Sequence, residues 1–306
     1  MSERLLIVGG TGFIGNNLAL SAVKGGISTT VLSLNCPVAE RKIKGIEYLQ
    51  ADVTHLSQLQ KQLKNLKFDY VVNLSGYIEH CSFLEGGRNI IDTHFIGVQN
   101  LIQVIDWYEL KRFVQIGSSD EYGNLPAPQS EEMREGPISS YSLGKLASTQ
   151  LLQMLYRTVK LPAVTLRLFL VYGPGQDEKR FLPQIIKGCL SDNNFPTSAG
   201  LQLRDFCYID DVIDGILTVL TNDKVNGEVI NLASGTPVAI REVVEQVQKT
   251  VGKGSPEFGE IPYRVGENME LYANVSKAKE LLDWEAKVSL ESGIEKTVCS
   301  IIKMNL

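Results

Sequence analysis

Tyr141 and Lys145 have the side chains and the spacing for proton transfer. They lie four positions apart in an amphipathic stretch that runs from Ser140 to about Tyr156, so both are expected on one face of a helix. A phenol with a reference pKa of about 10 is a poor acid or base at neutral pH, but a neighbouring ammonium favours the phenolate. We expect Lys145 to draw the pKa of Tyr141 toward neutrality, so that Tyr141 can exchange a proton with a substrate oxygen.

Hydroxyl and carboxyl groups follow the strand predicted at Phe113 to Ile116. Ligands of parallel α/β sheets bind beyond the carboxyl ends of the strands, so we expect Ser118 to hydrogen-bond the reacting oxygen and Ser119 to contact the substrate. Asp120 could act as a short base at the neighbouring carbon. The same composition is also typical of a solvated turn, with Asp120 and Glu121 in water.

A glycine turn near the start of the chain is typical of dinucleotide binding. Its residues are Gly9-Gly10-Thr11-Gly12-Phe13-Ile14-Gly15. The apolar run Leu5 to Val8 precedes it, and a helix-like stretch, Asn16 to Lys24, follows. Gly9 permits the tight turn, Gly12 lets backbone N–H groups approach a pyrophosphate, and Gly15 lets the helix pack closely on its strand.

Further apolar runs recur between amphipathic stretches, which is the pattern of repeated β-α-β units. The runs are Thr30 to Leu32, Ile46 to Leu49, Tyr70 to Leu74, Phe113 to Ile116 and Val164 to Leu168. They predict an α/β fold with a Rossmann-like doubly wound parallel sheet. We assign residues 1–166 to a dinucleotide-binding domain and 167–306 mainly to a smaller C-terminal substrate-binding lobe, with later chain crossings near 205–232.

The composition is that of an ordinary globular protein. The 306 residues are 43% hydrophobic and 21% charged, with a net charge of −5 and no basic footprint for nucleic acid or an anionic membrane. No apolar run reaches the roughly 18 residues of a membrane span, and we find no leader segment. Five widely spaced cysteines and three histidines without metal-ligand spacing predict a cytoplasmic, metal-free protein with buried cysteines.

Together these motifs resemble the extended short-chain dehydrogenases/reductases of the NAD-dependent epimerase/dehydratase family. The motifs occur in that family's order over nearly the whole chain: the glycine turn, then Ser118, Tyr141 and Lys145, then Arg167 with Val171 to Gly175, then Arg204 to Phe206 with Tyr208 to Asp211, and finally Ser276 to Ala278 with Leu282 to Trp284. The segments Phe258 to Ile261 and Ala273 to Asn274 are closest in pattern to nucleotide 4-keto-6-deoxysugar reductases of the abequose synthase type.

The resemblance assigns roles to individual residues. It implies that Tyr141 transfers the proton, that Ser118 donates to the substrate oxygen and that Lys145 holds the nicotinamide ribose. Arg204 and Arg264 would grip a substrate diphosphate, since a planar guanidinium binds phosphate in a bidentate manner. The expected cofactor contacts are Gly9, Thr11, Gly12, Phe13, Ile14, Gly15, Ser33, Asp52 near the adenine, Val53, Leu74, Tyr141 and Lys145.

The end of the second predicted strand departs from NAD-preferring folds. Those folds use an acidic residue there to bond the ribose 2′-hydroxyl, but this chain has Ser33 and no carboxylate up to Asn35. A carboxylate about 4 Å from a 2′-phosphate would repel it by a few kcal/mol at an effective dielectric near 20. Ser33 therefore favours NADP(H), with NAD(H) as the alternative. His94, expected to pack locally, stands where the family often has Asn, and Leu170 stands where an amide is usual.

The leading interpretation is NADPH-dependent reduction of the 4-keto group of a nucleotide-linked 4-keto-6-deoxyhexose. One alternative is a 4-epimerase or 4,6-dehydratase with tightly bound NAD, in which Ser119 and Asp120 occupy the acid–base positions. Another is a non-catalytic NADP(H) sensor or scaffold. The resemblance also implies a homodimer, formed through two long helices at Asp92 to Trp107 and Tyr141 to Tyr156.

Overall fold

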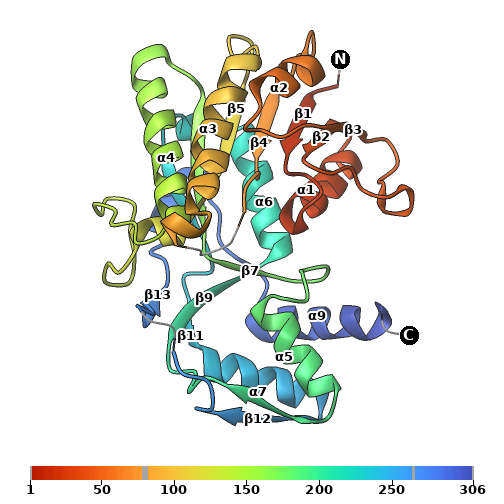
Figure 1. Ribbon diagram of the computed structural model, residues 1–306, viewed down its shortest axis with the longest axis vertical. Helices are drawn as coiled ribbons and strands as arrows, with labels where there is room; N and C mark the ends of the chain where they lie inside the picture. Colours follow the sequence, from red (N-terminus) through yellow and green to blue (C-terminus); the bar gives the residue numbers. More distant parts are fainter. Residues whose placement is uncertain (1, 78–81, 264–265, 305–306) are drawn as a thin grey trace.

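The upper tier of the molecule is a parallel sheet (Figure 1). The computed structural model describes residues 2–77, 82–263 and 266–304. The strand order is β10-β6-β5-β4-β1-β2-β3, and all neighbouring pairs are parallel. The strands are β1 (Arg4–Val8), β2 (Ser28–Ser33), β3 (Glu47–Gln50), β4 (Tyr70–Asn73), β5 (Arg112–Ser118), β6 (Ala163–Leu168) and β10 (Val229–Leu232). The predicted α/β class and doubly wound parallel sheet are confirmed.

Helices cover both faces of this sheet, because side chains alternate along each strand. Leu5 and Ile7 of β1 share a core with α1 (Phe13–Lys24) and α6 (Ile209–Leu220), which contact each other. Leu6 and Val8 belong to the core of the opposite face. The helices that pack side by side on that face are α2 (Leu56–Leu63), α3 (Gly87–Val104) and α4 (Ser140–Val159).

The lower tier in Figure 1 contains a smaller sheet around β9, which pairs with β7, β11 and β13. Its strands are β7 (Leu170–Tyr172), β9 (Leu203–Tyr208), β11 (Pro237–Ala239) and β13 (Glu270–Leu271), and a separate pair is formed by β8 (Asn194–Thr197) and β12 (Ser255–Phe258). The remaining α-helices are α5 (Phe181–Leu190), α7 (Ile240–Val251), α8 (Ser276–Leu282) and α9 (Leu290–Met304). One apolar core includes Ile7 of β1 and Val243 of α7, so the tiers share it.

Short 3₁₀ helices occur in the connections: η1 (Ala39–Arg41), η2 (Phe83–Glu85), η3 (Ser119–Tyr122) and η4 (Asp223–Val225). Among the described helices, none has the length and apolar character to cross a membrane.

Burial of the cysteines differs in part from the expectation. Cys189 and Cys207 are buried, but Cys36 and Cys299 are exposed, so the prediction was wrong for these two. Cys36 lies in the loop after β2, and Cys299 follows the buried Val298 on the outer face of α9. Cys81 lies outside the described residues.

Gly15 is the position in the glycine turn where an added methyl group would come closest to backbone atoms. A Cβ there would lie 2.6 Å from both the Gly10 Cα and the Gly9 carbonyl oxygen. We expect Gly15→Ala to lower the free energy of unfolding in urea by about 1 to 3 kcal/mol, because backbone must move. Gly25→Ala is the control: φ is −76° and the nearest atom lies 3.4 Å from the added Cβ. Equal stability of the two variants would contradict this packing.

Candidate active site

The glycine turn joins β1 to α1 at the carboxyl edge of the large sheet. Gly9 has a φ of +78°, and a Cβ there would lie 2.9 Å from the Leu74 carbonyl carbon, so glycine fits between β1 and the segment after β4. Gly12 is the N-cap of α1 and provides no capping side chain. The close contact of Gly15 is with Gly10. A Cβ at Gly15 would therefore meet the backbone directly after β1, which is consistent with the expected close packing of the helix.

This end of α1 fits the pyrophosphate of a dinucleotide. The first-turn N–H groups have no side-chain cap, and no acidic residue lies in the first turn, so an anion can complete the helix terminus. Ser33 ends β2 beside the turn, where its hydroxyl accepts a hydrogen bond from the Thr11 N–H (3.3 Å). The Leu74 N–H donates to the Val8 carbonyl (2.8 Å), so Leu74 lies beside the end of β1, on the β4 side of the glycine turn. The assigned contacts of these residues, and of Phe13 and Ile14, stay predictions.

Asp52 and Val53 follow β3 at the same edge. The Asp52 carboxylate accepts hydrogen bonds from the Thr54 N–H (2.9 Å) and hydroxyl (2.7 Å). Burial raises the pKa of Asp52, but the Thr54 hydrogen bonds outweigh it and hold the pKa below its ordinary value. Val53 is buried, and its carbonyl accepts from the Asn100 amide of α3 (2.9 Å). Asp52 is therefore a carboxylate at neutral pH, as an adenosine hydroxyl or amino group would require.

Helix α4 brings Tyr141 and Lys145 to the carboxyl end of β5. Both side chains are buried. The Lys145 Nζ donates to the Ile116 carbonyl (2.7 Å) and lies 5.8 Å from the centre of the Tyr141 ring. Ser118, the last residue of β5, hydrogen-bonds the Tyr141 hydroxyl. The three residues expected to share a site therefore lie together.

Serine side chains begin both helical segments of this site. The Ser139 hydroxyl accepts from the Ser142 N–H (3.0 Å) at the start of α4. The Ser118 hydroxyl accepts from the Asp120 N–H (3.2 Å), while the Glu121 carboxylate accepts from the Ser118 N–H (2.9 Å). This reciprocal capping box turns Glu121 back toward β5.

Burial controls the charge states of Tyr141 and Lys145. Burial raises the pKa of Tyr141 well above its ordinary value, the charge of Asp120 raises it further, and the hydrogen bond with Ser118 opposes this only in part. Burial lowers the pKa of Lys145 to about 8, against the attraction of Glu121. The expectation that Lys145 draws the pKa of Tyr141 toward neutrality was therefore wrong. Both groups have lost the water that favours their charged forms.

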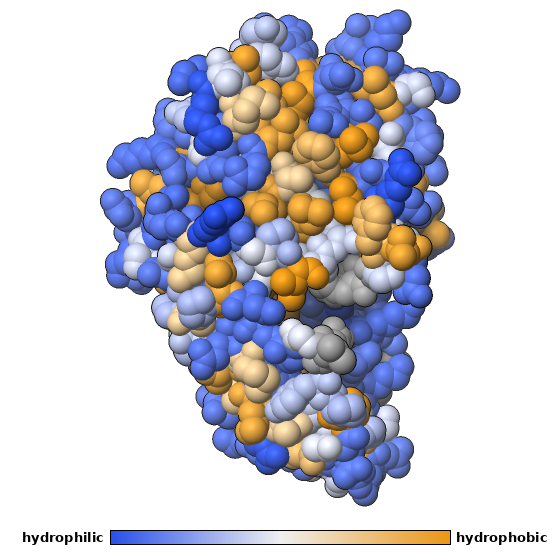
Figure 2. Space-filling model, turned by 60° about the vertical axis from the view of Figure 1, so that its left-hand side comes forward, coloured by the Kyte–Doolittle hydropathy of each residue, from blue (hydrophilic) through white to orange (hydrophobic). Residues whose placement is uncertain are grey.

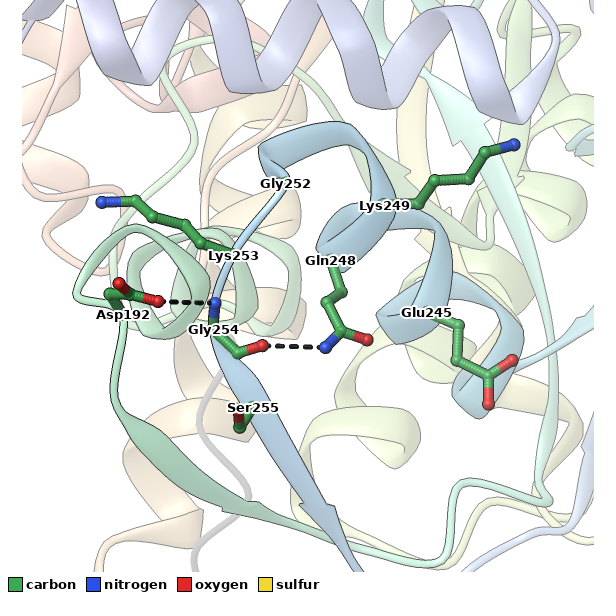
Figure 3. Close-up of a pocket in the computed structure, with 8 residues that line it drawn as sticks. All are labelled: Asp192, Glu245, Gln248, Lys249, Gly252, Lys253, Gly254 and Ser255. Carbon is green, nitrogen blue, oxygen red and sulfur yellow. Dashed lines mark hydrogen bonds between the residues drawn. The ribbon is translucent and has the colours of Figure 1, made fainter.

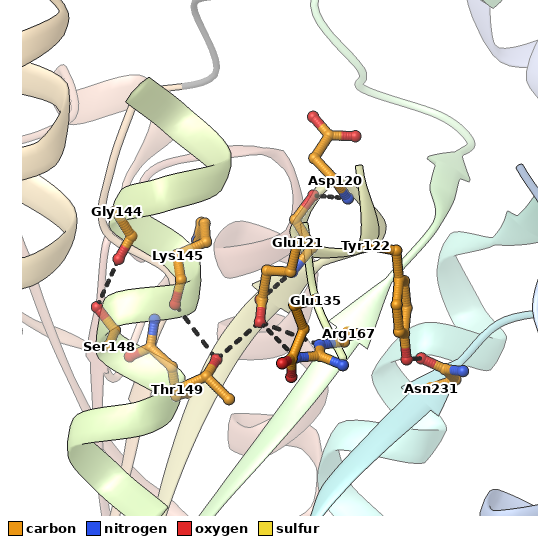
Figure 4. A network of polar contacts seen from close by, with 12 residues as sticks. Asp120, Glu121, Tyr122, Glu135, Gly144, Lys145, Ser148, Thr149, Arg167 and Asn231 are labelled. Atoms are coloured by element: carbon orange, nitrogen blue, oxygen red, sulfur yellow. Dashed lines mark hydrogen bonds and ion pairs between the residues drawn. The ribbon is translucent and has the colours of Figure 1, made fainter. Parts of the chain in front are cut away.

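The two carboxylates after Ser118 lie in different surroundings. Asp120 is partly exposed, and its charge acts on Tyr141, so it faces the site. Glu121 is 0% exposed and pairs with Arg167 of β6 at 2.9 Å (Figure 4). The solvated-turn interpretation was therefore wrong for Glu121, because the capping box and Arg167 hold its side chain inside.

Two side chains near Tyr141 come from elsewhere in the chain. His94 of α3 is buried edge-on to the Tyr141 ring, with centroids 5.1 Å apart, and its Nε2 hydrogen-bonds the Tyr77 carbonyl (2.9 Å). Burial lowers the pKa of His94 to about 3, so it packs as a neutral ring, as expected. Arg180 precedes α5, and its charge lowers the pKa of Tyr141. Sequence reasoning missed Arg180, because no motif spacing links it to the strand ends.

The residues expected to bind substrate are spread over both tiers. Ser119 is buried in η3 beside Ser118. Arg204 of β9 forms an ion pair with Glu267 and donates to the Leu203 carbonyl (2.8 Å). The sequence did not indicate Glu267 as a partner. Arg264 lies outside the described residues, and the diphosphate contacts of both arginines stay predictions.

A separate surface pocket lies in the lower tier between α7 and β12 (Figure 3). The Gly254 N–H donates to the Asp192 carboxylate (3.1 Å), and the Gln248 amide donates to the Gly254 carbonyl (2.8 Å). These polar groups therefore bond one another. Of the predicted site residues that the structure describes, none lines this pocket, so the candidate active site is the carboxyl edge of the large sheet.

The depressed pKa of Lys145 has a measurable effect on stability. Between about pH 8 and 10.5 the folded protein binds fewer protons at Lys145 than the unfolded chain does, so the free energy of unfolding rises with pH. We expect the wild type to gain up to about 3 kcal/mol over Lys145→Met in this window. Denaturant unfolding of both proteins at several pH values measures this gain. If the free energy of unfolding changed with pH in the same way in both proteins, the lowered pKa of the buried Lys145 would be contradicted.

Several curated proteins align with most of this chain. It is 26% identical to UDP-glucuronate 4-epimerase from Thermodesulfobacterium geofontis, over 84% of this chain and 80% of that protein. It is 27% identical to dTDP-glucose 4,6-dehydratase from Xanthomonas campestris, over 96% and 91%. It is 28% identical to UDP-N-acetyl-alpha-D-glucosaminuronate decarboxylase from Bacillus cytotoxicus, over 97% of both.

Solved structures share the fold. UDP-glucose 4-epimerase from Thermotoga maritima, solved with UDP-glucose, has a TM-score of 0.90 and 24% identity, over 99% of this chain and 100% of that one. dTDP-glucose 4,6-dehydratase from Bacillus anthracis, solved with NAD, has a TM-score of 0.85 and 24% identity, over 99% and 97%. The sequence profile of the NAD dependent epimerase/dehydratase family matches residues 5–233. Because this match spans well over half of the chain and includes the whole carboxyl edge of the sheet from the glycine turn to β10, the chain belongs to the NAD-dependent epimerase/dehydratase family.

Proposed function

We propose that the protein reduces the 4-keto group of a nucleotide-linked 4-keto-6-deoxyhexose with NADPH. The observation that carries this proposal is the end of β2. Ser33 lies beside the glycine turn, the segment from Ser33 to Val38 contains no acidic residue, and η1 with its neighbour then provides Glu40, Arg41 and Lys42. A 2′-phosphate would therefore meet no carboxylate of this segment, which removes the repulsion that excludes NADP(H) from many such folds.

The protonation state of Tyr141 also supports reduction as the first step. Burial keeps the phenol protonated, and reduction of a ketone consumes one hydride and one proton. When bound, the reduced nicotinamide supplies the hydride. Tyr141 gives its proton to the oxygen at C4, Ser118 donates a hydrogen bond to the same oxygen, and the carbonyl becomes an alcohol. Lys145 contributes its positive charge close to this oxygen.

A second candidate is a 4-epimerase or 4,6-dehydratase that keeps NAD bound. Asp120 supports it, because a carboxylate that faces Tyr141 could remove a proton from the carbon next to the reacting one. The names of the relatives also support it, since they include an epimerase and a dehydratase. Such enzymes begin with an oxidation, for which Tyr141 must accept a proton rather than donate one.

The test is to mix the purified protein with NADPH or NADH and a panel of nucleotide 4-keto-6-deoxysugars. Loss of absorbance from the reduced nicotinamide measures turnover. Stoichiometric oxidation that favours NADPH is expected. The opposite outcome is that the purified protein carries bound NAD, converts unmodified nucleotide sugars and consumes no added cofactor. That outcome would contradict the reductase proposal and favour the second candidate.

Ser33 is expected to decide the choice of cofactor. We expect Ser33→Asp to lower the ratio of kcat/KM for NADPH to kcat/KM for NADH by about tenfold or more, because the new carboxylate repels the 2′-phosphate. The control is Ser33→Asn, because an asparagine side chain has the size of aspartate without its charge. This variant should leave the ratio nearly unchanged. If both variants shift the ratio alike, size rather than charge selects the cofactor.

The homodimer stays a proposal, and the surface supports it. The face turned forward in Figure 2 carries apolar side chains over its upper half. Leu143 and Met154 of α4 are 47% and 41% exposed, and a second copy could cover them. Sedimentation should give twice the chain mass of 33.8 kDa, and Leu143→Glu should give the single mass. A wild-type monomer would exclude the dimer.

A further inference from the structure

Glu121 is a fully buried charge to which the proposed reaction assigns no step. Its two carboxylate oxygens have partners on three elements (Figure 4). Oε1 accepts from the Ser118 N–H of β5 (2.9 Å). Oε2 accepts from the Thr149 hydroxyl of α4 (3.0 Å) and the Arg167 Nε–H of β6 (3.0 Å). A buried carboxylate with all these bonds is held in one orientation.

The strand before the site leaves space for this carboxylate. A Cβ on Gly117 would lie 2.6 Å from the Glu121 Oε1 and 2.9 Å from the Thr165 Cγ2, so any larger residue would displace Glu121. Arg167 also pairs with Glu135 at 2.6 Å. One guanidinium thus faces two carboxylates, and the cluster has a net negative charge beneath the site.

Lys145 is the nearby cation that lacks a charged hydrogen-bond partner. Among the described residues its Nζ donates to one neutral group, the Ile116 carbonyl (2.7 Å). Thr149 lies one turn along α4 and donates to both Glu121 and the Lys145 carbonyl (3.0 and 3.2 Å), so the two residues are held in one network. Burial lowers the pKa of Lys145, and the charge of Glu121 opposes that effect.

We propose that Glu121 is a positioning residue: it holds the Ser118 backbone and supplies the negative charge that keeps the buried Lys145 an ammonium. This inference rests on the proposed function only where it concerns turnover. The charge of Lys145 is a property of the free protein, so it can be measured whether or not the protein is a reductase.

The test is a pH titration of the full chain by NMR with ¹³C-labelled lysine. The Lys145 Cε signal is assigned by its loss in Lys145→Met. In the wild type this signal should titrate with the pKa of about 8. In Glu121→Gln the pKa of Lys145 should be lower by about 1 unit or more, because the opposite charge of the carboxylate is lost. If Glu121 had only a structural role, the variant would loosen the site, water would enter and the pKa of Lys145 would rise. A rise or no change overturns the proposal.

Glu135→Gln is the matched control. It removes the other carboxylate that pairs with Arg167, but Glu135 makes no hydrogen bond to Ser118 or Thr149 among the described residues. The Lys145 titration should stay at its wild-type position in this variant. An equal shift in both variants would assign the effect to Arg167 and overturn the role of Glu121.

Turnover provides the second readout. In Glu121→Gln the alkaline limb of the pH profile should move with the Lys145 titration, and kcat should fall more than KM changes, because Ser118 loses its backbone anchor. If the wild type reduces no keto sugar, the proposed function fails, while the NMR titration still decides the role of Glu121.

If Glu121→Gln does not fold, the cause is that the buried Arg167 keeps only one carboxylate partner, Glu135, and the double variant Glu121→Gln/Arg167→Met removes both charges of the Glu121–Arg167 pair. The pKa of Lys145 should again fall below the wild-type value, because burial then acts unopposed. A value equal to or above that of the wild type overturns the proposal.

Discussion

Parallel pairing places the carboxyl ends of β1, β2, β4 and β5 along one edge of the large sheet. The glycine turn, Ser33, Leu74 and Ser118 all lie where a strand leaves the sheet at this edge. Helix α4 then returns along one face and brings Tyr141 and Lys145 to the end of β5. An antiparallel pair would place one of its two carboxyl ends at the opposite edge. The glycine turn and the Tyr141–Lys145 pair therefore lie at the same edge because the strands share one direction.

Burial at this edge sets the charge states of Tyr141 and Lys145. Tyr141 and Lys145 are buried, so the phenol keeps its proton and the ammonium binds its proton less tightly. The Glu121 carboxylate and the Arg167 guanidinium are equally buried, but their mutual bonds and those to Ser118 and Thr149 compensate for lost hydration. An ion pair beneath the site can thus act on a cation within it.

The family shares a scaffold, and individual side chains differ within it. The relatives include proteins named as an epimerase, a dehydratase and a decarboxylase, so the fold alone does not select one reaction. In this chain Ser33 ends β2 beside the glycine turn, and a neutral His94 packs against Tyr141. Leu170 is 38% exposed at the start of β7, and its side chain has no amide group. Differences in cofactor and reaction are expected to come from such positions.

Local features of the site were predicted correctly from the sequence. The turn after β1 follows from an apolar run, closely spaced glycines and a helix, all within a few residues. The placement of Tyr141 and Lys145 on one face follows from the helical repeat. Alternating strand and helix patterns also predicted the parallel sheet, because crossovers of that length join parallel strands.

The tertiary structure decided which of the site side chains are buried, which charges they carry and which residues they bond. Glu121 reads as a turn residue, yet it is buried because Thr149 and Arg167, 28 and 46 positions away, close around it. The pairing of Arg204 with Glu267, which spans 63 positions, depends likewise on the packing of the lower tier. Short-range pattern therefore determined which elements form and which side chains share a face. The protonation of Tyr141 and Lys145 depends on how much water and which charges surround them, and only the packing of distant segments sets these.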